Sequence, residues 1–325
     1  MYNKLPIIFI CGVGRSGTSL LQSMLGSHSK VTFLPETAFI RRFIATHALQ
    51  KAYERGGINL VFELLQEDYR VGQIGIDLKR IFAPFWRSRE KFSEVAVYNR
   101  ILAACFRDTQ SKYVGDKDPR LIEYLPLLNR NWPNAHVIHL VRDPRDVLVK
   151  KKRAIWSSGR PSLQHVFANR VQLRLGKKTG KMLFGNRYQE VFYERLIADP
   201  KIVLNSICER LEISFEPNML DFSRTAASLV NSFEMPWKLE TLGPLLSENC
   251  EKWKEELSSF EIVMSEVACK ETMKLGTYIS SGRFKDLDLS RKYLVLVCKI
   301  VMMIAGGIYT KYRLAKQQIS YNSKF

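Results

Sequence analysis

The chain has 325 residues, which leaves room for two domains or one large α/β domain at roughly 150 residues per domain. Hydrophobic residues make up 46% of it and charged residues 25%, which excludes a largely disordered, collagen-like or disulfide-scaffold protein. Lys and Arg outnumber Asp and Glu by 50 to 32, and the net charge of +18 attracts nucleic acid, anionic lipid or a phosphate-rich small molecule. Charge alone does not choose among these partners.

The cysteines and the N-terminus bear on compartment. Six cysteines lie far apart and none has metal-ligand spacing, so we expect all six to be reduced and structural, and we expect no metal site. The first residues run into an apolar, strand-like segment within five positions, which is too early for a secretory signal. We therefore expect a cytoplasmic protein.

Apolar runs and helical patterns alternate along the chain. Residues 6–11 are apolar and rich in β-branched side chains, which predicts a strand buried on both faces of a parallel sheet. A glycine-rich turn follows, and a helix is predicted over 18–26. Further strands are predicted at 135–141 and 188–193, each with a helical segment after it. The order predicts an α/β fold with a P-loop-like parallel β-sheet flanked by helices.

A long segment separates the first two predicted strands. Residues 38–132 have a mainly helical pattern, and an insertion of this size is expected to cap a site rather than to form a loop. We expect residues 1–285 to form one domain that includes this insertion. Residues 286–325 are expected to form a basic and hydrophobic C-terminal helical tail.

The turn after the first strand resembles a phosphate-binding loop. In G-V-G-R-S-G-T-S, residues 12–19, the two outer glycines stand five apart as in G-x-x-x-x-G-K-[ST], but Thr18 occupies the lysine position. Backbone N–H groups at a helix start converge on an anion, so we expect a bound phosphate. Without the lysine, transfer of a dianionic γ-phosphoryl group lacks its usual charge neutralisation. A less charged sulfuryl group needs only Arg15, hydroxyls and backbone donors.

These motifs resemble those of the PAPS-dependent sulfotransferases, in the group of tyrosylprotein, Golgi carbohydrate and bacterial enzymes; PAPS is 3′-phosphoadenosine-5′-phosphosulfate. The resemblance implies a loop for the 5′-phosphosulfate made of Arg15, Ser16, Gly17, Thr18 and Ser19. It also implies that V-R-D-P-R-D, at 141–146, holds the 3′-phosphate through Arg142. Trp253 and Leu275-Gly276 resemble the family's C-terminal region, so the likeness extends over about residues 5–280.

Two charged residues are candidates for the chemistry, together with Arg15. Glu36 lies 21 residues after Arg15, and the resemblance implies that it is the general base that takes a proton from the acceptor hydroxyl. Its alternative is an ordinary glutamate at a helix start. Lys117, in G-D-K-D-P-R, matches the lysine that stabilises charge on the leaving phosphate. Asp116 and Asp118 beside it suggest the alternative of a surface ion-pair cluster.

Three further residues have two interpretations each. Arg42 resembles a substrate-side arginine, or is a solvated surface arginine. Lys150 stands eight residues after Arg142, where the family has a serine, so a second contact to the 3′-phosphate stays open. The run 150–153 is otherwise a solvated helix face. Tyr193 resembles a tyrosine near the nucleotide, or is a core tyrosine.

The expected function is transfer of a sulfuryl group from PAPS to a hydroxyl acceptor by in-line displacement. A P-loop nucleotide kinase or NTPase is the alternative, because it shares the loop and the sheet. A nucleic-acid-binding module would use the net charge of +18, but no recognition motif is present, so we expect no nucleic-acid partner. The acceptor stays open among carbohydrate, lipid, metabolite and tyrosyl hydroxyls.

The tail contains an apolar segment, 293–309, whose single charge is Lys299 and which basic residues flank within 291–316. A span needs ~20 apolar residues, and a central lysine costs ~2.5–3.5 kcal/mol on insertion scales. A spanning helix is therefore the least favoured interpretation. A helix docked on the domain and peripheral contact with the inner face of a membrane are the other two, and we favour the peripheral contact.

Overall fold

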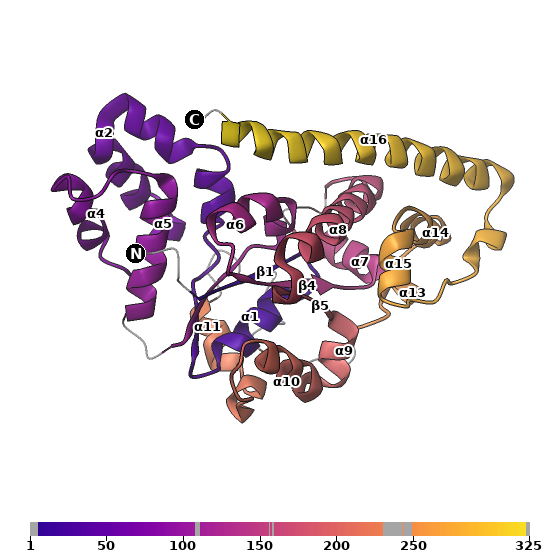
Figure 1. The fold of residues 1–325 in the computed structure, drawn as a ribbon. Coiled ribbons are helices and arrows are strands. Elements are labelled where there is room, and N and C mark those ends of the chain that lie inside the picture. Colours follow the sequence, from indigo (N-terminus) through magenta and orange to yellow (C-terminus); the bar gives the residue numbers. More distant parts are fainter. Residues whose placement is uncertain are drawn as a thin grey trace.

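The computed structural model describes residues 6–107, 111–155, 159–229 and 249–322, together with positions 157 and 243. Its centre is a parallel five-stranded sheet in the order β2–β3–β1–β4–β5. The strands are β1 (Ile7–Gly12), β2 (Val31–Phe33), β3 (Tyr113–Lys117), β4 (His136–Val141) and β5 (Tyr188–Phe192). Helices lie on both sides of the sheet (Figure 1), which confirms the predicted α/β fold with a P-loop-like sheet.

The central strand β1 explains this layering. Its side chains alternate, so that Ile7 and Phe9 enter one apolar cluster while Ile8 and Ile10 enter another. Both faces of the strand therefore need a cover of helices. The first cluster lies under α5 (Glu94–Arg107), α6 (Leu125–Asn131) and α8 (Ser162–Phe184). The second lies under α1 (Thr18–Gly26), α9 (Tyr193–Ala198), α10 (Pro200–Arg210) and α11 (Ser223–Leu229).

Two short strands lie beyond those predicted from the sequence. β2 has only three residues, and β3 reads Y-V-G-D-K, so neither shows the apolar run that marks a buried strand. All five residues of β3 are nevertheless buried, because it pairs with β1 on one side and with β2 on the other. β3 lies within residues 38–132, and so two charged side chains of this segment enter the sheet.

Helices fill most of the described part of residues 38–132. They are the short π-helical turn η1 (Ile40–Ile44), α2 (Ala48–Gln66), α3 (Tyr69–Gly72), α4 (Leu78–Trp86) and α5, followed after β3 by the 3-10 helix η2 (Pro119–Glu123) and α6. In Figure 1, α2, α4 and α5 form a group at one side of the sheet. The ring of Phe39 stacks on that of Tyr98 in α5 at 4.9 Å, which ties the start of this segment to its last long helix.

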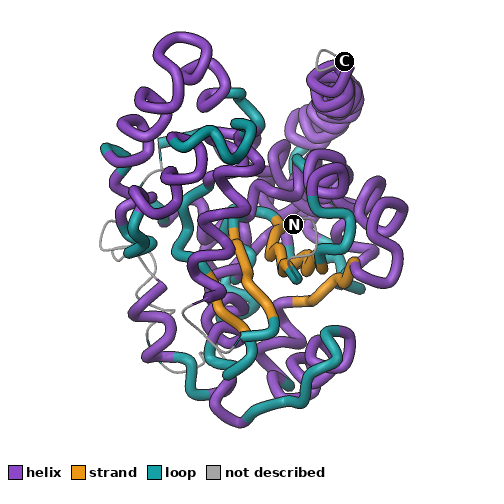
Figure 2. Tube along the Cα trace, turned by 60° about the vertical axis from the view of Figure 1, so that its left-hand side comes forward, coloured by secondary structure: helices purple, strands orange, loops and turns teal. Residues whose placement is uncertain are grey.

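The C-terminal helices pack on the other side. They are α7 (Pro144–Arg153), α13 (Trp253–Glu256), α14 (Ser259–Ala268), α15 (Lys270–Leu275) and the long α16 (Leu289–Asn322). A third apolar cluster joins α7, α13, α14 and α16 and includes Leu148, Val263 and Met302. The tube in Figure 2, like the ribbon in Figure 1, shows α16 lying against the outside of the helical layer. Short 3-10 helices are found at Gly185–Arg187, Pro217–Leu220 and Arg283–Asp286.

Candidate functional site

Every strand of the sheet presents a candidate residue at the same edge. In open parallel sheets, ligands bind just beyond the carboxyl ends of the strands. The structure places the sequence candidates there: the loop Arg15–Ser19 after β1, Glu36 after β2, Lys117 as the last residue of β3, Arg142 directly after β4 and Tyr193 directly after β5. Positions that are far apart in the chain thus line one edge of the sheet.

The loop after β1 is shaped to receive an anion. Gly17 has a left-handed φ of +95°, and a Cβ there would lie 2.4 Å from the ring of Tyr193. The Oγ of Ser16 is buried and makes no hydrogen bond to any described residue. No side chain caps the N-terminus of α1, so its first N–H groups point at the loop without a side-chain acceptor. Tyr193 therefore packs under the loop, and the loop keeps hydrogen-bond donors available.

Lys117, Glu36 and Ser19 meet beside this loop. The Lys117 side chain is fully buried, its Nζ forms an ion pair with the Glu36 carboxylate, and it donates to Ser19 Oγ at 3.2 Å. The side chain of Glu36 remains 19% exposed, so its carboxylate has access to solvent. The alternative of a surface ion-pair cluster is wrong, because Asp116, Lys117 and Asp118 are all buried.

The two aspartates beside Lys117 have separate contacts. Asp116 accepts a hydrogen bond of 2.5 Å from the hydroxyl of Tyr98, and burial raises the pKa of Asp116 to about 7. Asp118 pairs with Arg41 at 2.9 Å and accepts a hydrogen bond from the first turn of η2. The partner of Asp116 could not be predicted from the sequence, because Tyr98 comes from α5.

Arg142 joins the other half of the edge. Its guanidinium stacks on the Tyr193 ring at 3.9 Å, and its Nη atoms donate to the carbonyl oxygens of Arg15 at 3.4 Å and Asn249 at 2.5 Å. The Nε of Arg142 is buried and has no hydrogen-bond partner among the described residues. Asn249 donates from Nδ2 to the Tyr193 hydroxyl at 3.0 Å. Asn249 carries no sequence signal, since it reaches the site only through the fold.

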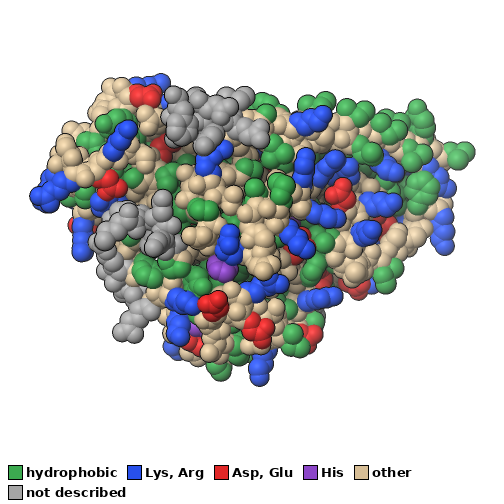
Figure 3. Space-filling view, viewed as in Figure 1, with side chains coloured by type: hydrophobic (Ala, Val, Ile, Leu, Met, Phe, Trp, Pro, Cys, Tyr) green, Lys and Arg blue, Asp and Glu red, His purple; other side chains and the backbone are tan. Residues whose placement is uncertain are grey.

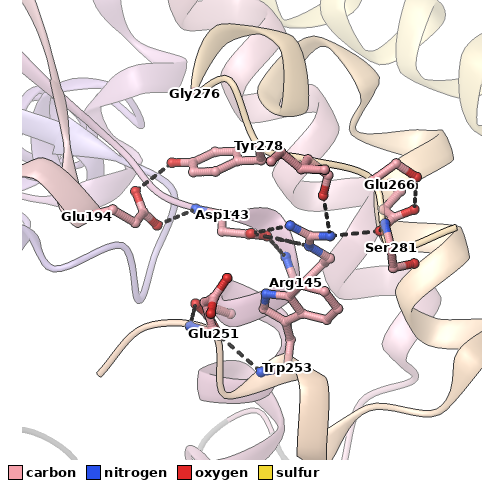
Figure 4. A network of polar contacts seen from close by, with 12 residues as sticks. Asp143, Arg145, Glu194, Glu251, Trp253, Glu266, Gly276, Tyr278 and Ser281 are labelled. Carbon is pink, nitrogen blue, oxygen red and sulfur yellow. Dashed lines mark hydrogen bonds and ion pairs between the residues drawn. The ribbon is translucent and has the colours of Figure 1, made fainter. Parts of the chain in front are cut away.

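The rest of the V-R-D-P-R-D motif holds the C-terminal segment in place (Figure 4). Arg145 pairs with Asp143 at 2.6 Å and with Glu266 at 2.7 Å, and it stacks on the Trp253 ring at 3.7 Å. Asp146 accepts a hydrogen bond from the backbone N–H of Trp253 at 3.1 Å. These side chains are bound to one another, which leaves Arg142 as the motif's arginine at the edge of the sheet.

Gly276 has a packing role in the same network. A Cβ on Gly276 would lie 2.1 Å from the ring of Tyr278. Tyr278 donates from its hydroxyl to Glu194 at 2.6 Å, and the other Glu194 oxygen accepts the backbone N–H of Asp143 at 2.9 Å. Figure 4 shows this chain of contacts from Tyr278 to the start of α7. The Leu275-Gly276 signature thus supports the turn that carries Arg142.

The contacts of Arg42 and of the basic run in α7 bear on the interpretation of both as solvated surface residues. Arg42 pairs with Asp68 and donates to the carbonyl oxygen of Thr37 at 3.3 Å, so it is not a freely solvated arginine. Lys150 and Lys151 are buried, at 4% and 5% exposed, so a solvated helix face is wrong for these two. Burial lowers the pKa of Lys151 to about 8. In the rest of the run, Lys152 pairs with Glu261 and Arg153 with Glu256.

Among the residues that the structure describes, no group of three or more His, Cys, Asp or Glu side chains is arranged to hold a metal ion. All six cysteines are free thiols. The candidate groups at the carboxyl edge of the sheet are hydroxyls, an ammonium group, guanidinium groups, backbone N–H groups and the carboxylate of Glu36.

Sequence relatives identify the family. The model of the sulfotransferase family matches residues 6–217, which is more than half of the chain. Protein-tyrosine sulfotransferase 2 of Gallus gallus is 26% identical over 229 residues, covering 67% of this chain and 54% of that protein. Protein-tyrosine sulfotransferase 1 of Homo sapiens is 29% identical over 146 residues, covering 44% of this chain and 33% of that protein. The chain thus spans about half or less of the length of these curated relatives.

Solved structures agree on the fold. The sulfotransferase domain of the Synechococcus PCC 7002 olefin synthase superposes with a TM-score of 0.61 at 19% identity, covering 84% of this chain and 95% of that one. The sulfotransferase domain from the curacin biosynthetic pathway gives a TM-score of 0.58 at 20% identity, covering 85% and 98%. At these identities the superposition shows a shared fold only. Because the family model matches residues 6–217, the chain belongs to the sulfotransferase family, a family of transferases.

Proposed function

We propose that this chain transfers a sulfuryl group from PAPS to a hydroxyl acceptor by in-line displacement. The observation that carries the proposal is the meeting of Lys117, Glu36 and Ser19 at the phosphate-type loop. A base, a cation and a loop hydroxyl lie within contact of one another at the edge of the sheet. The family match favours this reaction over that of a nucleotide kinase.

The residues present fit a donor with an anion at each end. Ser16 Oγ and Arg142 Nε are buried donors without a hydrogen-bond partner among the described residues, and buried polar groups of this kind are normally satisfied by a ligand or water. One anionic end would be held by the loop residues Arg15, Ser16, Gly17, Thr18 and Ser19. The 3′-phosphate would be held by Arg142 and Lys150, beside the ring of Tyr193. When bound, the donor supplies the electrophilic sulfur.

The chain's own groups then have separate tasks. Glu36 accepts the proton of the acceptor hydroxyl, and its exposed fraction gives the acceptor access. The Lys117 ammonium stabilises the negative charge that grows on the departing phosphate oxygen, and Arg15 does so from the loop. Burial of Lys117 strengthens this effect, because solvent screens the charge less there.

We assign the acceptor side to the helical part of the segment 38–132, within the proposed catalytic domain, 1–285; Lys117, on the strand of this segment, belongs to the donor side. Arg42 lies in this segment and, held by Asp68, would contact the acceptor. A hydroxyl acceptor is the class that the family implies. Tyrosyl groups are one candidate, since relatives carry the name protein-tyrosine sulfotransferase; carbohydrate, lipid and metabolite hydroxyls are the others.

Two measurements test the proposal. Calorimetry should detect adenosine 3′,5′-bisphosphate binding without magnesium, and labelled PAPS should transfer its sulfur to members of a panel of tyrosyl peptides, carbohydrates, phenols and lipid alcohols. Magnesium-dependent ATP binding with no binding of the bisphosphate would replace the proposal with the kinase alternative. Bisphosphate binding that Arg142→Ala leaves unchanged would refute the assigned nucleotide site.

A further inference from the structure

The C-terminal helix α16 exposes an apolar stripe on the side that faces away from the domain. The stripe contains Tyr293, Val297, Ile300, Val301, Ile304 and Ile308, which are between 36% and 71% exposed. Their spacing places them on one face of the helix, over about 23 Å at about 1.5 Å per residue. Figure 3 shows the hydrophobic side chains along the outer edge of this helix. Such a stripe, unlike scattered single residues, indicates a binding surface.

The opposite face of α16 is fixed to the domain. Val295 and Met302 are buried in the apolar cluster with α7 and α14. Further along the helix, Tyr309 donates to Glu123 at 3.1 Å and Arg313 pairs with the same carboxylate at 3.1 Å. Gln317 Nε2 donates to the carbonyl oxygen of Glu123 at 2.8 Å. The helix is therefore held along its length by apolar packing and by these polar contacts.

Lys299 lies on this domain side. It follows Val295 by four residues and precedes Met302 by three, which places all three on one face of the helix. Its side chain is only partly exposed. The charge that interrupts the apolar segment in the sequence is therefore absent from the outward stripe. A span across a bilayer would instead bring Lys299 and the partners of Glu123 into lipid.

The charges around the stripe are basic. Residues 289–322 contain six Lys and Arg and no Asp or Glu. Lys311 and Lys316 are exposed beyond one end of the stripe, and Arg291, which pairs with Asp288 at 3.3 Å, is exposed near the other end. A helix with an apolar outer face and basic ends has the pattern of an interfacial membrane helix, whose cations reach anionic headgroups. The net charge of +18 on the chain acts in the same direction.

We propose that α16 is a membrane-docking helix that lies in the plane of an anionic lipid surface, with its stripe inserted at the level of the headgroups and its other face bound to the domain. The occupant of the stripe is thus a lipid surface rather than a second copy of the chain, because a basic helix repels its own copy. This inference stands apart from the proposed chemistry, since none of the stripe residues belongs to the candidate site.

Vesicle sedimentation of the full chain tests it. The chain should sediment with vesicles of phosphatidylserine and phosphatidylcholine, bind more weakly to phosphatidylcholine alone, and lose binding as salt is raised. The double variant Ile300→Glu/Ile304→Glu should lower binding by about 10-fold or more, because it removes apolar contact and adds repulsion. Ile202→Glu is the matched control, because Ile202 is 69% exposed on α10, and it should bind like the parent chain.

Other outcomes would overturn the proposal. The parent chain staying in solution with both kinds of vesicle would do so, as would a double variant that binds like the parent. Sedimentation equilibrium that shows a dimer abolished by the double variant, without vesicle binding, would assign the stripe to a second copy. In cells, alkaline carbonate should release the protein from the membrane fraction. Retention of the protein in that fraction would indicate that α16 spans the membrane instead. The double variant should still bind adenosine 3′,5′-bisphosphate, because the stripe lies outside the candidate site. This measurement keeps a failure of membrane docking distinguishable from a failure of the proposed activity.

Discussion

The buried ammonium of Lys117 is paired with the partly exposed carboxylate of Glu36, at the ends of neighbouring strands β3 and β2. The pair joins the proposed base to the proposed stabiliser of the leaving group. The same ammonium also contacts the loop through Ser19, so it links the acceptor side of the site to the donor side.

Glu36→Gln removes the proposed base and keeps the shape of the side chain. We expect turnover to fall ~10²–10⁴-fold, as for the loss of general-base catalysis, while the affinity for adenosine 3′,5′-bisphosphate changes little. Labelled PAPS in a single-turnover assay and calorimetry give the two values. Glu256→Gln is the matched control, because Glu256 pairs with Arg153 on another part of the surface. Normal turnover in Glu36→Gln would exclude the role.

Lys117→Met keeps most of the side-chain volume and removes the charge. We expect a loss of about 10²–10³-fold in kcat, the cost of removing one donor to a developing anion. A positioning role through Glu36 predicts differently: Lys117→Met would then cost nothing in the Glu36→Gln background. The four rates of the double-mutant cycle separate these roles, and a further loss in the double variant supports direct stabilisation of the leaving group.

Arg142→Ala removes the guanidinium that stacks on Tyr193. A hydrogen bond to a charged group contributes about 1.5–3 kcal/mol, so the Kd for adenosine 3′,5′-bisphosphate should rise roughly 10- to 100-fold. Binding of a nucleotide without the 3′-phosphate should change less. Arg195→Ala is the control, since Arg195 is exposed on α9 and lies over the Phe192 ring at 5.6 Å. Equal effects of the two variants would contradict the assignment.

Gly17→Ala places a Cβ where the ring of Tyr193 lies, at a left-handed φ of +95°. The loop or the tyrosine has to shift, and we expect bisphosphate binding to weaken strongly while the folded chain persists. Gly72→Ala, where a Cβ meets nothing within 4 Å, should bind as the parent does. Calorimetry gives the affinity of both variants for the bisphosphate. Tight binding by Gly17→Ala would show that the loop is not part of the nucleotide site.

Asp116 predicts a pH dependence of stability. Burial raises its pKa from 3.8 to about 7, so the folded state holds a proton that the unfolded state releases. Between about pH 4 and 7 the folded state therefore binds more protons, and the free energy of unfolding should fall as the pH rises. Asp116→Asn still accepts the hydrogen bond of Tyr98 but does not titrate, so its urea midpoint should fall less from pH 5 to pH 8. Parallel pH curves would refute this.

The sequence predicts the parts of the fold that have long apolar runs. β1, β4 and β5 lie within one or two residues of their predicted positions, and α1 begins and ends where the pattern indicates. β2 and β3 were not predicted, because β2 is short and β3 ends in charged residues. Those charges are buried because β3 lies between two other strands, and the hydropathy of β3 alone does not indicate this.

The same limit applies to the site. The sequence picks out Glu36 and Lys117 through motif spacing, yet their ion pair follows from the adjacency of β2 and β3. Asn249 and Tyr98 have no signature at all, because each reaches its partner from a remote segment. A run of charged residues suggests a solvated helix face, but the structure buries two residues of the run, Lys150 and Lys151, under the helices around α7.

Glu123, which ties α16 to the domain, stands six residues after Lys117 on the connection that leaves β3. Shortening the protein before residue 289 would take away Tyr309 and Arg313, two partners of the buried Glu123 carboxylate, and Gln317, which donates to the Glu123 carbonyl oxygen, close to the candidate site. Arg120 and Gln172 would remain as partners of the carboxylate. Rates measured on a variant that lacks α16 should therefore not be taken as the rates of the full chain. Point changes on the outer face of the helix leave that anchorage intact.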